Sequence, residues 1–449
     1  MTTVIIGAGI AGLTAAWRLH EAGIKVTLLE QSSNVGGCIR TMHNDGYLLE
    51  LGPNTFLNSS VSLWNLAYSL GLKDLKIETP PKIGKTRFIF KKDKIVSVPA
   101  GPGILFSPLL SFKGRLRLLK EPFIKALSPG DESLASFVRR RLGEEVLHML
   151  VTPFVSGIYA GDPEQLSVAA VFPKLVEVEK KYGSIFKGMK ALKTEIKSSG
   201  LGSFMAGIGT LPMAIESRLK DSIVKNARVT GIEKLNSGYN IRFEAGGEQQ
   251  NILAKKIICA VPAYTAARIL SGLSNEFKEI LSKIEYAPII VIHTGYKHED
   301  VPYDLKGFGF LVPRKNRVRI LGSVWSSSLF QERAPEGYAL LTNFLGGQLD
   351  PEAIDLTNDD IMRIVQKDLS RALSIKSPPA FACITRYTHA IPQYNIGHLE
   401  KISRISKLLE QFNGLFLTGS YFTGISVAET VEHAEKITKE VQHGFQSNI

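Results

Sequence analysis

The sequence predicts an α/β fold in which a discontinuous Rossmann-like nucleotide-binding domain is combined with an α+β domain and a helical insertion. Three observations lead to it. The first thirty residues contain the pattern of a strand, a glycine turn, a helix and a second strand. Residues 414–419 contain another strand and glycine turn. Between these two ends lie alternating apolar segments that suggest an antiparallel sheet. We expect the nucleotide-binding domain at residues 1–80, 202–265 and 382–449, the α+β domain at 81–100 and 266–381, and the helical insertion at 101–201.

The composition is that of an ordinary globular protein. With 449 residues, 44% hydrophobic and 21% charged, the chain is unlike disordered, collagenous and coiled-coil proteins. Its three cysteines are far apart, which fits a reducing compartment and argues against a disulfide scaffold or zinc ribbon. The nine histidines lack metal-binding spacing, so we expect no metal. No run of about 20 apolar residues is present, so we expect a cytoplasmic protein without a spanning helix.

The first thirty residues carry the clearest motif. Val4–Ile6 predicts a strand that leads into the glycine turn Gly7–Gly12, Leu13–Ala22 predicts a helix, and Lys25–Leu29 predicts a strand that ends at Glu30. In such a unit the first glycine permits a tight turn, the second lets the backbone approach a pyrophosphate, and the third lets the helix pack on the strand. Glu30 would accept hydrogen bonds from a ribose diol. This pattern predicts dinucleotide binding, with a chance glycine-rich turn as the alternative.

Two further segments favour a flavin over NAD. The pair Gly36-Gly37 stands close behind Glu30, which suggests that the backbone passes the cofactor a second time. Near the other end, a helix is predicted to begin after Gly424 and to run to Val441. Its N-terminal amides would face the N1/O2 edge of a flavin, which becomes anionic on reduction. The alternative is an ordinary terminal helix that is capped by Ser426.

The net charge of +12 is concentrated in one region. Between Lys82 and Glu145 there are 14 Lys and Arg against 6 Asp and Glu, a difference of +8. Aliphatic residues alternate with these cations from Ile104 to Lys120, as on an amphipathic segment at an anionic membrane surface. A solvated helix face is the alternative. No nucleic-acid-binding module accompanies the charge, so we expect no nucleic-acid partner.

Four motifs together resemble those of the flavin-dependent porphyrinogen oxidases, within the broader superfamily of amine oxidases and carotenoid desaturases. They are Phe154–Pro163 with Leu166-Ser167, Ser327–Phe330 with Arg333-Ala334-Pro335, Ile391–Tyr394 with Gly397-His398, and Gly424–Ala428. The match runs in order along nearly the whole chain. Two places depart from the usual patterns: Gly207-Ile208-Gly209 lacks an adjacent glycine pair, and Gly419–Phe422 replaces the Gly-Asp of related flavin folds.

The resemblance implies an FAD-binding domain of the glutathione-reductase and amine-oxidase type, and it implies site residues. Arg87 falls where the family places an arginine that pairs with a substrate propionate, and the tetrapyrrole pocket would be lined by Gly157, Gly309, Leu311 and Phe344. FAD would be held by Gly7, Ala8, Gly9, Ile10, Ala11, Gly12, Glu30, Gln31, Cys38, Gly52, Pro53, Asn54, Thr55, Val229, Ile425, Ser426 and Val427.

The same resemblance implies an activity and partners. We expect protoporphyrinogen IX to be oxidised to protoporphyrin IX in three two-electron steps, with hydride passing to flavin N5, no catalytic side chain, and O2 or another acceptor taking the electrons. Peripheral contact with the inner face of the cell membrane, a homodimer and a hand-off of product to a chelatase are further expectations. Three alternatives stay open: coproporphyrinogen III as substrate, another flavin oxidase that acts on amines or polyenes, and a carrier without enzymatic activity.

Overall fold

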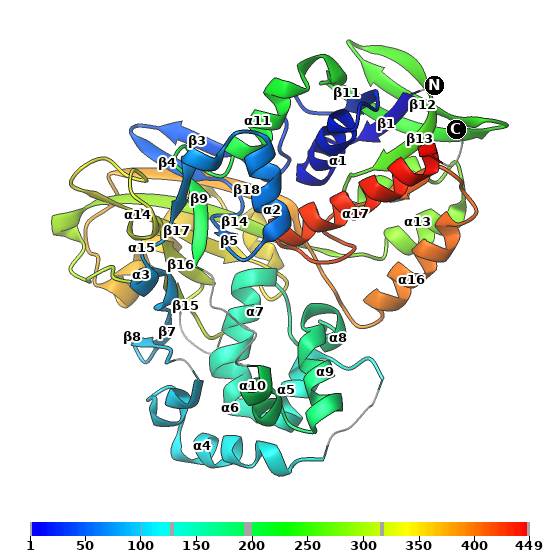
Figure 1. Cartoon of the computed structure of the whole chain (residues 1–449). Helices are drawn as coiled ribbons and strands as arrows, with labels where there is room; N and C mark the ends of the chain where they lie inside the picture. Colours follow the sequence, from blue (N-terminus) through cyan, green and yellow to red (C-terminus); the bar gives the residue numbers. More distant parts are fainter. Residues whose placement is uncertain (1, 100, 126–129, 193–199, 315–317, 447–449) are drawn as a thin grey trace.

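The computed structural model describes residues 2–99, 101–125, 130–192, 200–314 and 318–446. It has three parts, a nucleotide-binding part around one mixed sheet, an antiparallel-sheet part, and a helical part below both in Figure 1. Segments 126–129 and 193–199 of the predicted helical insertion lie outside the described residues.

The nucleotide-binding part joins the two ends of the chain in one sheet. Its strand order is β10-β2-β1-β13-β12-β11, and β19 pairs with β13. The central strands are parallel, with Val4 opposite Thr27 and Ile257, and Ile257 opposite Leu415. This confirms a Rossmann-like fold in discontinuous pieces. The strands are β1 (Thr2–Ile6), β2 (Val26–Leu29), β10 (Ile223–Val224), β11 (Ala227–Leu235), β12 (Gly238–Ala245), β13 (Glu248–Cys259) and β19 (Leu415–Leu417).

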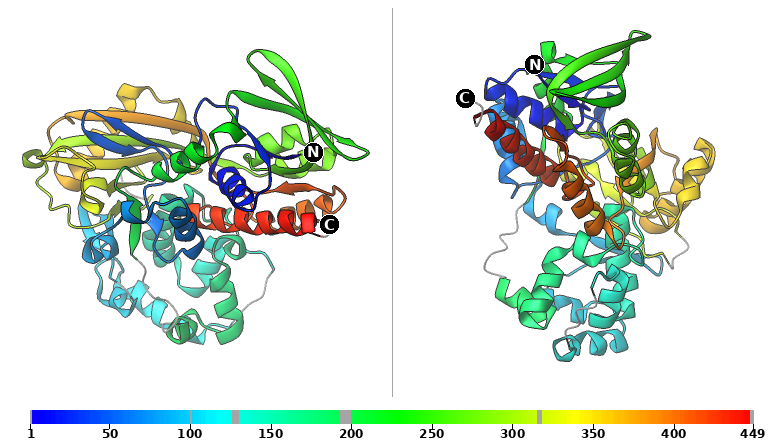
Figure 2. Two further views of the ribbon diagram at one scale, coloured as in Figure 1. Left: turned by 45° about the horizontal axis from the view of Figure 1, so that its top comes forward. Right: turned by 90° about the vertical axis from the view of Figure 1, so that its right-hand side faces the viewer.

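Helices cover both faces of this sheet because its strands alternate between two cores. Ile5 packs with one group of helices, whereas Val4 and Ile6 pack with the other. Figure 2 shows the resulting layers. The first group comprises α1 (Ile10–Glu21), α2 (Val61–Ser69), α11 (Thr210–Arg218) and α17 (Val427–Gln446), and the second comprises α12 (Ala263–Ile269), α13 (Asn275–Leu281) and α16 (His398–Leu409).

The antiparallel-sheet part has the strand order β18-β14-β17-β16-β15-β7-β8, in which only β15 and β7 are parallel. One face packs on α15 (Asn358–Leu373) through residues such as Phe310 and Val365. The sheet extends to Pro392, past the predicted boundary at 382, because β18 pairs with β14. Its strands are β7 (Phe88–Lys91), β8 (Lys94–Ser97), β14 (Tyr286–Lys297), β15 (Gly309–Leu311), β16 (Gly322–Trp325), β17 (Tyr338–Gly346) and β18 (Phe381–Pro392).

Smaller elements connect the two sheets. The hairpin of β3 and β4 packs on the antiparallel sheet, where Tyr47 and Leu49 contact Leu340 and Phe381, and β5, β9 and β6 form a separate three-stranded sheet. The strands are β3 (Thr41–Asn44), β4 (Tyr47–Glu50), β5 (Phe56–Leu57), β6 (Lys76–Glu78) and β9 (Leu201–Phe204). Two short helices, α3 (Pro81–Lys85) before β7 and α14 (Ser326–Leu329) between β16 and β17, complete this region.

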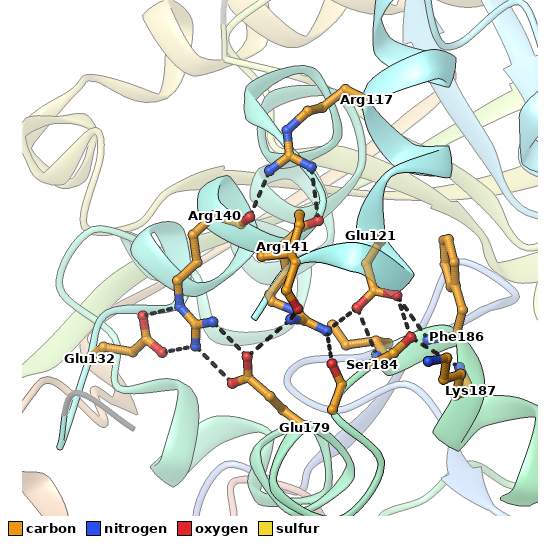
Figure 3. A network of polar contacts seen from close by, with 12 residues as sticks. Arg117, Glu121, Glu132, Arg140, Arg141, Glu179, Ser184, Phe186 and Lys187 are labelled. Carbon is orange, nitrogen blue, oxygen red and sulfur yellow. Dashed lines mark hydrogen bonds and ion pairs between the residues drawn. The ribbon is translucent and has the colours of Figure 1, made fainter. Parts of the chain in front are cut away.

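The helical part has an apolar core and a buried ion-pair network (Figure 3). Arg140 pairs with Glu132 and Glu179, and the fully buried Arg141 pairs with Glu121. Glu121 also accepts hydrogen bonds from the Ser184 hydroxyl and the Ile185 amide, so the network joins the middle of this part to its end. The helices are α4 (Phe112–Leu119), α5 (Leu134–Arg141), α6 (Glu144–Val146), the π-helical η4 (Leu147–Val151), α7 (Thr152–Tyr159), α8 (Val168–Val171), α9 (Pro173–Tyr182) and α10 (Ile185–Leu192).

Candidate functional site

The glycine turn between β1 and α1 has the geometry that a dinucleotide needs. Gly7 has φ +97°, and a Cβ on Gly12 would lie 1.9 Å from the Gly7 carbonyl oxygen, so the chain itself requires both glycines. Gly9 differs, because a Cβ there would meet no described atom within 4 Å. Packing therefore does not explain Gly9, whereas a pyrophosphate that approaches this backbone would. Ile10 and Ala11 begin α1 behind the turn.

Glu30 is fixed against this turn at the end of β2. Its carboxylate accepts hydrogen bonds from the Ala8 amide at 2.7 Å and from the Ser32 amide at 2.8 Å. A carboxylate has about four acceptor positions, so each oxygen can still accept a ribose hydroxyl. The neighbouring Gln31 is exposed, and Val229 is buried in β11, whose first residue bonds to the Glu30 carbonyl oxygen.

The second glycine pair lies against the first turn. The Gly36 amide donates to the Ala8 carbonyl oxygen at 2.7 Å, and a Cβ on Gly37 would be 3.4 Å from the Gly9 Cα. Cys38 continues this path, since a Cβ on Gly52 would lie 2.2 Å from the Cys38 carbonyl oxygen. The structure thus brings the glycine turn, Cys38 and Gly52 together. Pro53, Asn54 and Thr55 follow as half-buried residues.

The start of α17 is held by a reciprocal cap. The Ser426 hydroxyl accepts from the Glu429 amide, while the Glu429 carboxylate accepts from the Ser426 amide and hydroxyl. The cap by Ser426, considered from the sequence as an alternative to a cofactor contact, is therefore present. Ile425 packs on the core of the helical part and Val427 on the core around α1, so α17 begins where the parts meet (Figure 1).

Four of the five predicted substrate residues gather on one face of the antiparallel sheet and on α7. Leu311 and Phe344 lie on the same face because both pair with Gly322. Gly309 lies two residues before Leu311 on that face. Helix α7 packs directly on it, since a Cβ on Gly157 would be 2.5 Å from the Leu311 Cδ2.

Arg87 stands at one end of this face, just before β7. Phe88 is opposite Phe310, which places Arg87 beside Gly309. Its guanidinium lies 4.5 Å from the centre of the Phe308 ring and donates to the Gly84 carbonyl oxygen at 2.5 Å. Burial lowers the Arg87 pKa, and no acidic side chain of the described residues pairs with it. This cation can therefore bind an anionic ligand.

Sequence reasoning missed several residues of the same face. Val324 lies on it opposite Gly309, and Thr342 is the next residue across the sheet. No strand was predicted over β16, although its Val324-Trp325 pair consists of residues that favour strands. Glu50 and Arg333, a buried pair of opposite charges 3.9 Å apart, were also not assigned to the site.

An open cavity of about 580 Å³ lies elsewhere, on the antiparallel-sheet part. Tyr303, Ser328, Arg333 and Glu336 are among its lining residues, and none of the predicted FAD or substrate residues lines it. We therefore assign the candidate site to the glycine turns and to the sheet face with Leu311 and Phe344, and not to this cavity. No group of three or more His, Cys, Asp or Glu that could hold a metal occurs within the described ranges.

Comparisons with known proteins bear on the family and on the fold. The family described as flavin containing amine oxidoreductases matches residues 10–441. The chloroplastic protoporphyrinogen oxidase of Nicotiana tabacum is 35% identical over 474 residues, covering 99% of this chain and 86% of the relative. The coproporphyrinogen III oxidase of Bacillus subtilis (strain 168) is 31% identical, covering 96% of both chains. A solved structure from Exiguobacterium sp. 255-15 superposes with a TM-score of 0.85 at 22% identity over 99% of both chains.

Proposed function

Since the chain belongs to the flavin-containing amine oxidoreductase family, we propose that this FAD-dependent oxidoreductase converts protoporphyrinogen IX to protoporphyrin IX. One observation carries the proposal: the apolar face with Leu311 and Phe344 ends at Arg87, a half-buried cation without an acidic partner among the described residues. An apolar macrocycle with carboxylates on its rim has complementary chemistry. The full-length similarity to the tobacco protoporphyrinogen oxidase supports it.

FAD supplies the two-electron acceptor, and the residues of the chain bind and orient. Gly7, Gly9 and Glu30 would hold the dinucleotide, as the open space at Gly9 and the orientation of the Glu30 carboxylate allow. Leu311 and Phe344 would contact the macrocycle and exclude water from its faces. Arg87 would fix its orientation by binding a propionate, since a guanidinium matches a carboxylate in a two-point hydrogen bond. Orientation of this kind lowers the barrier without acid-base chemistry from the protein.

Coproporphyrinogen III is the second candidate substrate, because the Bacillus subtilis relative is 31% identical over nearly the whole of both chains. It has two more propionates and two fewer vinyl groups than protoporphyrinogen IX, so the two molecules differ in charge at the rim. Oxygen is the acceptor that we propose, with homodimer formation and product transfer to a chelatase as secondary proposals. If neither porphyrinogen is converted in the assay below, amines and polyenes become the substrates to test.

We also propose that the helical part contacts an anionic membrane surface. No helix within the described part of the chain is long and apolar enough to cross a membrane. Phe106 and Phe123, however, are 84% and 88% exposed, and Phe112 on α4 is 75% exposed. Lys113 and Lys120 flank these rings. Exposed rings beside cations are typical of segments that rest in the headgroup region.

The test of the proposed reaction is a paired assay. Purified holoenzyme is mixed with protoporphyrinogen IX or coproporphyrinogen III under nitrogen and then exposed to oxygen, and porphyrin fluorescence is compared with an enzyme-free blank. We expect faster conversion of protoporphyrinogen IX. Faster conversion of coproporphyrinogen III would make that molecule the proposed substrate instead. Rates equal to the blank for both molecules would exclude porphyrinogens as substrates.

A further inference from the structure

The motif Ser327–Pro335 contains none of the residues that were predicted to bind FAD or substrate, yet its arginine is buried. Arg333 is 2% exposed, and its guanidinium donates to the carbonyl oxygens of Met205 and Phe204 and to the Ser203 hydroxyl, at 2.9 to 3.1 Å. Its own carbonyl oxygen accepts from the Leu48 amide in β4. The motif is thus tied to the strand that leads into Gly52–Thr55.

Glu50, the last residue of β4, faces Arg333. Its carboxyl group accepts from the Thr41 hydroxyl at 2.7 Å and from the Ile208 amide at 2.9 Å. Arg333 lies 3.9 Å away, too far for a hydrogen bond, so the carboxylate charge is only partly compensated. Burial raises the Glu50 pKa to about 7, and His293, which contacts the Glu50 carbonyl oxygen, is neutral there because burial lowers its pKa to about 4.

A small cavity lies between Glu50, Asn54, Ser326 and Arg333. Its volume is about 10 Å³, which is about the room that one water molecule needs, and four polar side chains around it could bind that water. Arg333 also lines the open cavity of about 580 Å³, where Glu332 adds a second carboxylate near it. Arg333 therefore lines both the small cavity beside the buried carboxyl group and the cavity that is open to solvent.

We propose that Glu50 and a water molecule in the small cavity exchange a proton with solvent through the open cavity, in response to the charge of FAD. This rests on the proposed contact between FAD and Gly52–Thr55, because Asn54 belongs to that segment and lines the small cavity. Added negative charge beside Glu50 raises its proton affinity. A proton from solvent water then forms an O–H bond on the carboxylate when the cofactor is reduced, and it returns when the cofactor is reoxidised. No electron passes through Glu50, which takes up and releases only a proton.

The test counts protons that the holoenzyme takes up on anaerobic photoreduction, with a pH-indicator dye in weak buffer. The wild type should take up more protons per flavin than Glu50→Gln at pH 7.5 to 8, where Glu50 is ionised before reduction, and the difference should vanish near pH 5.5. Asp368→Asn is the matched control, since Asp368 on α15 is another buried carboxylate that accepts hydrogen bonds from two backbone amides, those of Arg319 and Ile320. Equal uptake by wild type and Glu50→Gln at pH 8 would overturn the proposal.

A second measurement needs no folded Glu50 variant. The infrared difference spectrum of the wild type at pH 8 should show a protonated-carboxyl band that appears on reduction, and Thr41→Val should shift it by removing a hydrogen bond. Absence of that band also overturns the proposal. Porphyrinogen turnover of the same preparation separates the two claims: turnover without proton uptake removes only this inference, and uptake without turnover supports it while removing the proposed substrate.

Discussion

Substitutions of two glycines in the same turn should affect FAD binding and folding separately. Gly9→Ala places a methyl group where no described atom lies within 4 Å, whereas Gly12→Ala places it 1.9 Å from the Gly7 carbonyl oxygen. We expect Gly9→Ala to leave the melting temperature of the FAD-free protein unchanged but to weaken FAD retention at least tenfold. Gly12→Ala should lower the melting temperature. Equal FAD affinity in Gly9→Ala and wild type, measured by flavin release on dilution, would place the pyrophosphate elsewhere.

Arg87 can be tested in the same way at the other end of the site. Hydrogen bonds to charged groups contribute about 1.5 to 3 kcal/mol, so Arg87→Ala should lower kcat/KM for the porphyrinogen by about 10- to 100-fold. The flavin spectrum should not change, because Arg87 is not among the residues at the glycine turn. Arg228→Ala, which removes an exposed ion pair with Glu244, is the matched control. A kcat/KM that equals that of the control would contradict propionate binding by Arg87.

At the scale of elements, the helical part offers a test of membrane contact. Phe112 on α4 and Phe123, which follows that helix in sequence, are exposed, and burial of such rings among lipid headgroups is favourable by about 25 cal/mol per Å². Phe112→Ser with Phe123→Ser should reduce co-sedimentation with anionic vesicles, and so should high salt. Val61→Ser, a substitution of an exposed apolar residue on α2, should not. If the double variant co-sediments with anionic vesicles as well as the wild type does, these rings do not contact the membrane.

The ion-pair network is a second element-scale feature. Removing one partner of a buried pair costs about 3 to 5 kcal/mol because the other charge stays buried. Arg141→Met should therefore destabilise the helical part, as faster hydrogen exchange in α5 and α9 would report, since Arg141 and Glu179 join them. Arg141→Met combined with Glu121→Leu should recover only part of the loss, because the Ser184 hydroxyl and the Ile185 amide then lose their acceptor. Exchange that is equal in wild type and Arg141→Met would show that the network is not important for stability.

The elements also show what could be predicted from sequence. Local signals predicted β1, α1, β2 and β19, because glycine turns and apolar runs are short-range. The mixed architecture was confirmed as well. The strand β16 was missed, since its pairing depends on residues far along the chain, such as Phe344 for Gly322. Likewise, nothing adjacent in sequence marks Glu50 and Arg333 as a pair.

For the whole molecule, buried histidines predict how stability depends on pH. His293 and His398 are almost fully buried, and burial lowers the pKa of each to about 4. An unfolded histidine titrates near 6.5, so below that pH the unfolded chain binds more protons and the free energy of unfolding falls. Each group accounts for up to about 3 kcal/mol between pH 6.5 and 4.

The predicted result is a lower urea midpoint at pH 5 than at pH 7, with a smaller difference in His398→Gln. Glu50 acts in the opposite direction, because its raised pKa makes the free energy of unfolding fall as the pH rises from about 4.5 to about 7. Because Glu50 is present in both proteins, the difference in pH dependence between His398→Gln and the wild type gives the contribution of His398. An identical pH dependence in both would contradict a neutral, buried His398.

The three parts of the molecule meet where the site lies. The Gln393 amide donates to the Tyr159 carbonyl oxygen at the end of α7, and Tyr394 donates to the Ser420 carbonyl oxygen near the start of α17. The antiparallel sheet, α7 and α17 therefore share one junction, as Figure 1 shows. We propose that a porphyrinogen bound at this junction reduces FAD.

The most direct measurement of that claim is anaerobic stopped-flow absorbance of the holoenzyme mixed with protoporphyrinogen IX. Because no acceptor is present, the flavin band should bleach while the porphyrin band rises, with three flavins reduced for each porphyrin formed. Arg87→Ala should show the same amplitude at a higher substrate concentration. A flavin that stays oxidised with protoporphyrinogen IX and coproporphyrinogen III, yet is reduced by an amine or a polyene, would contradict the proposed function.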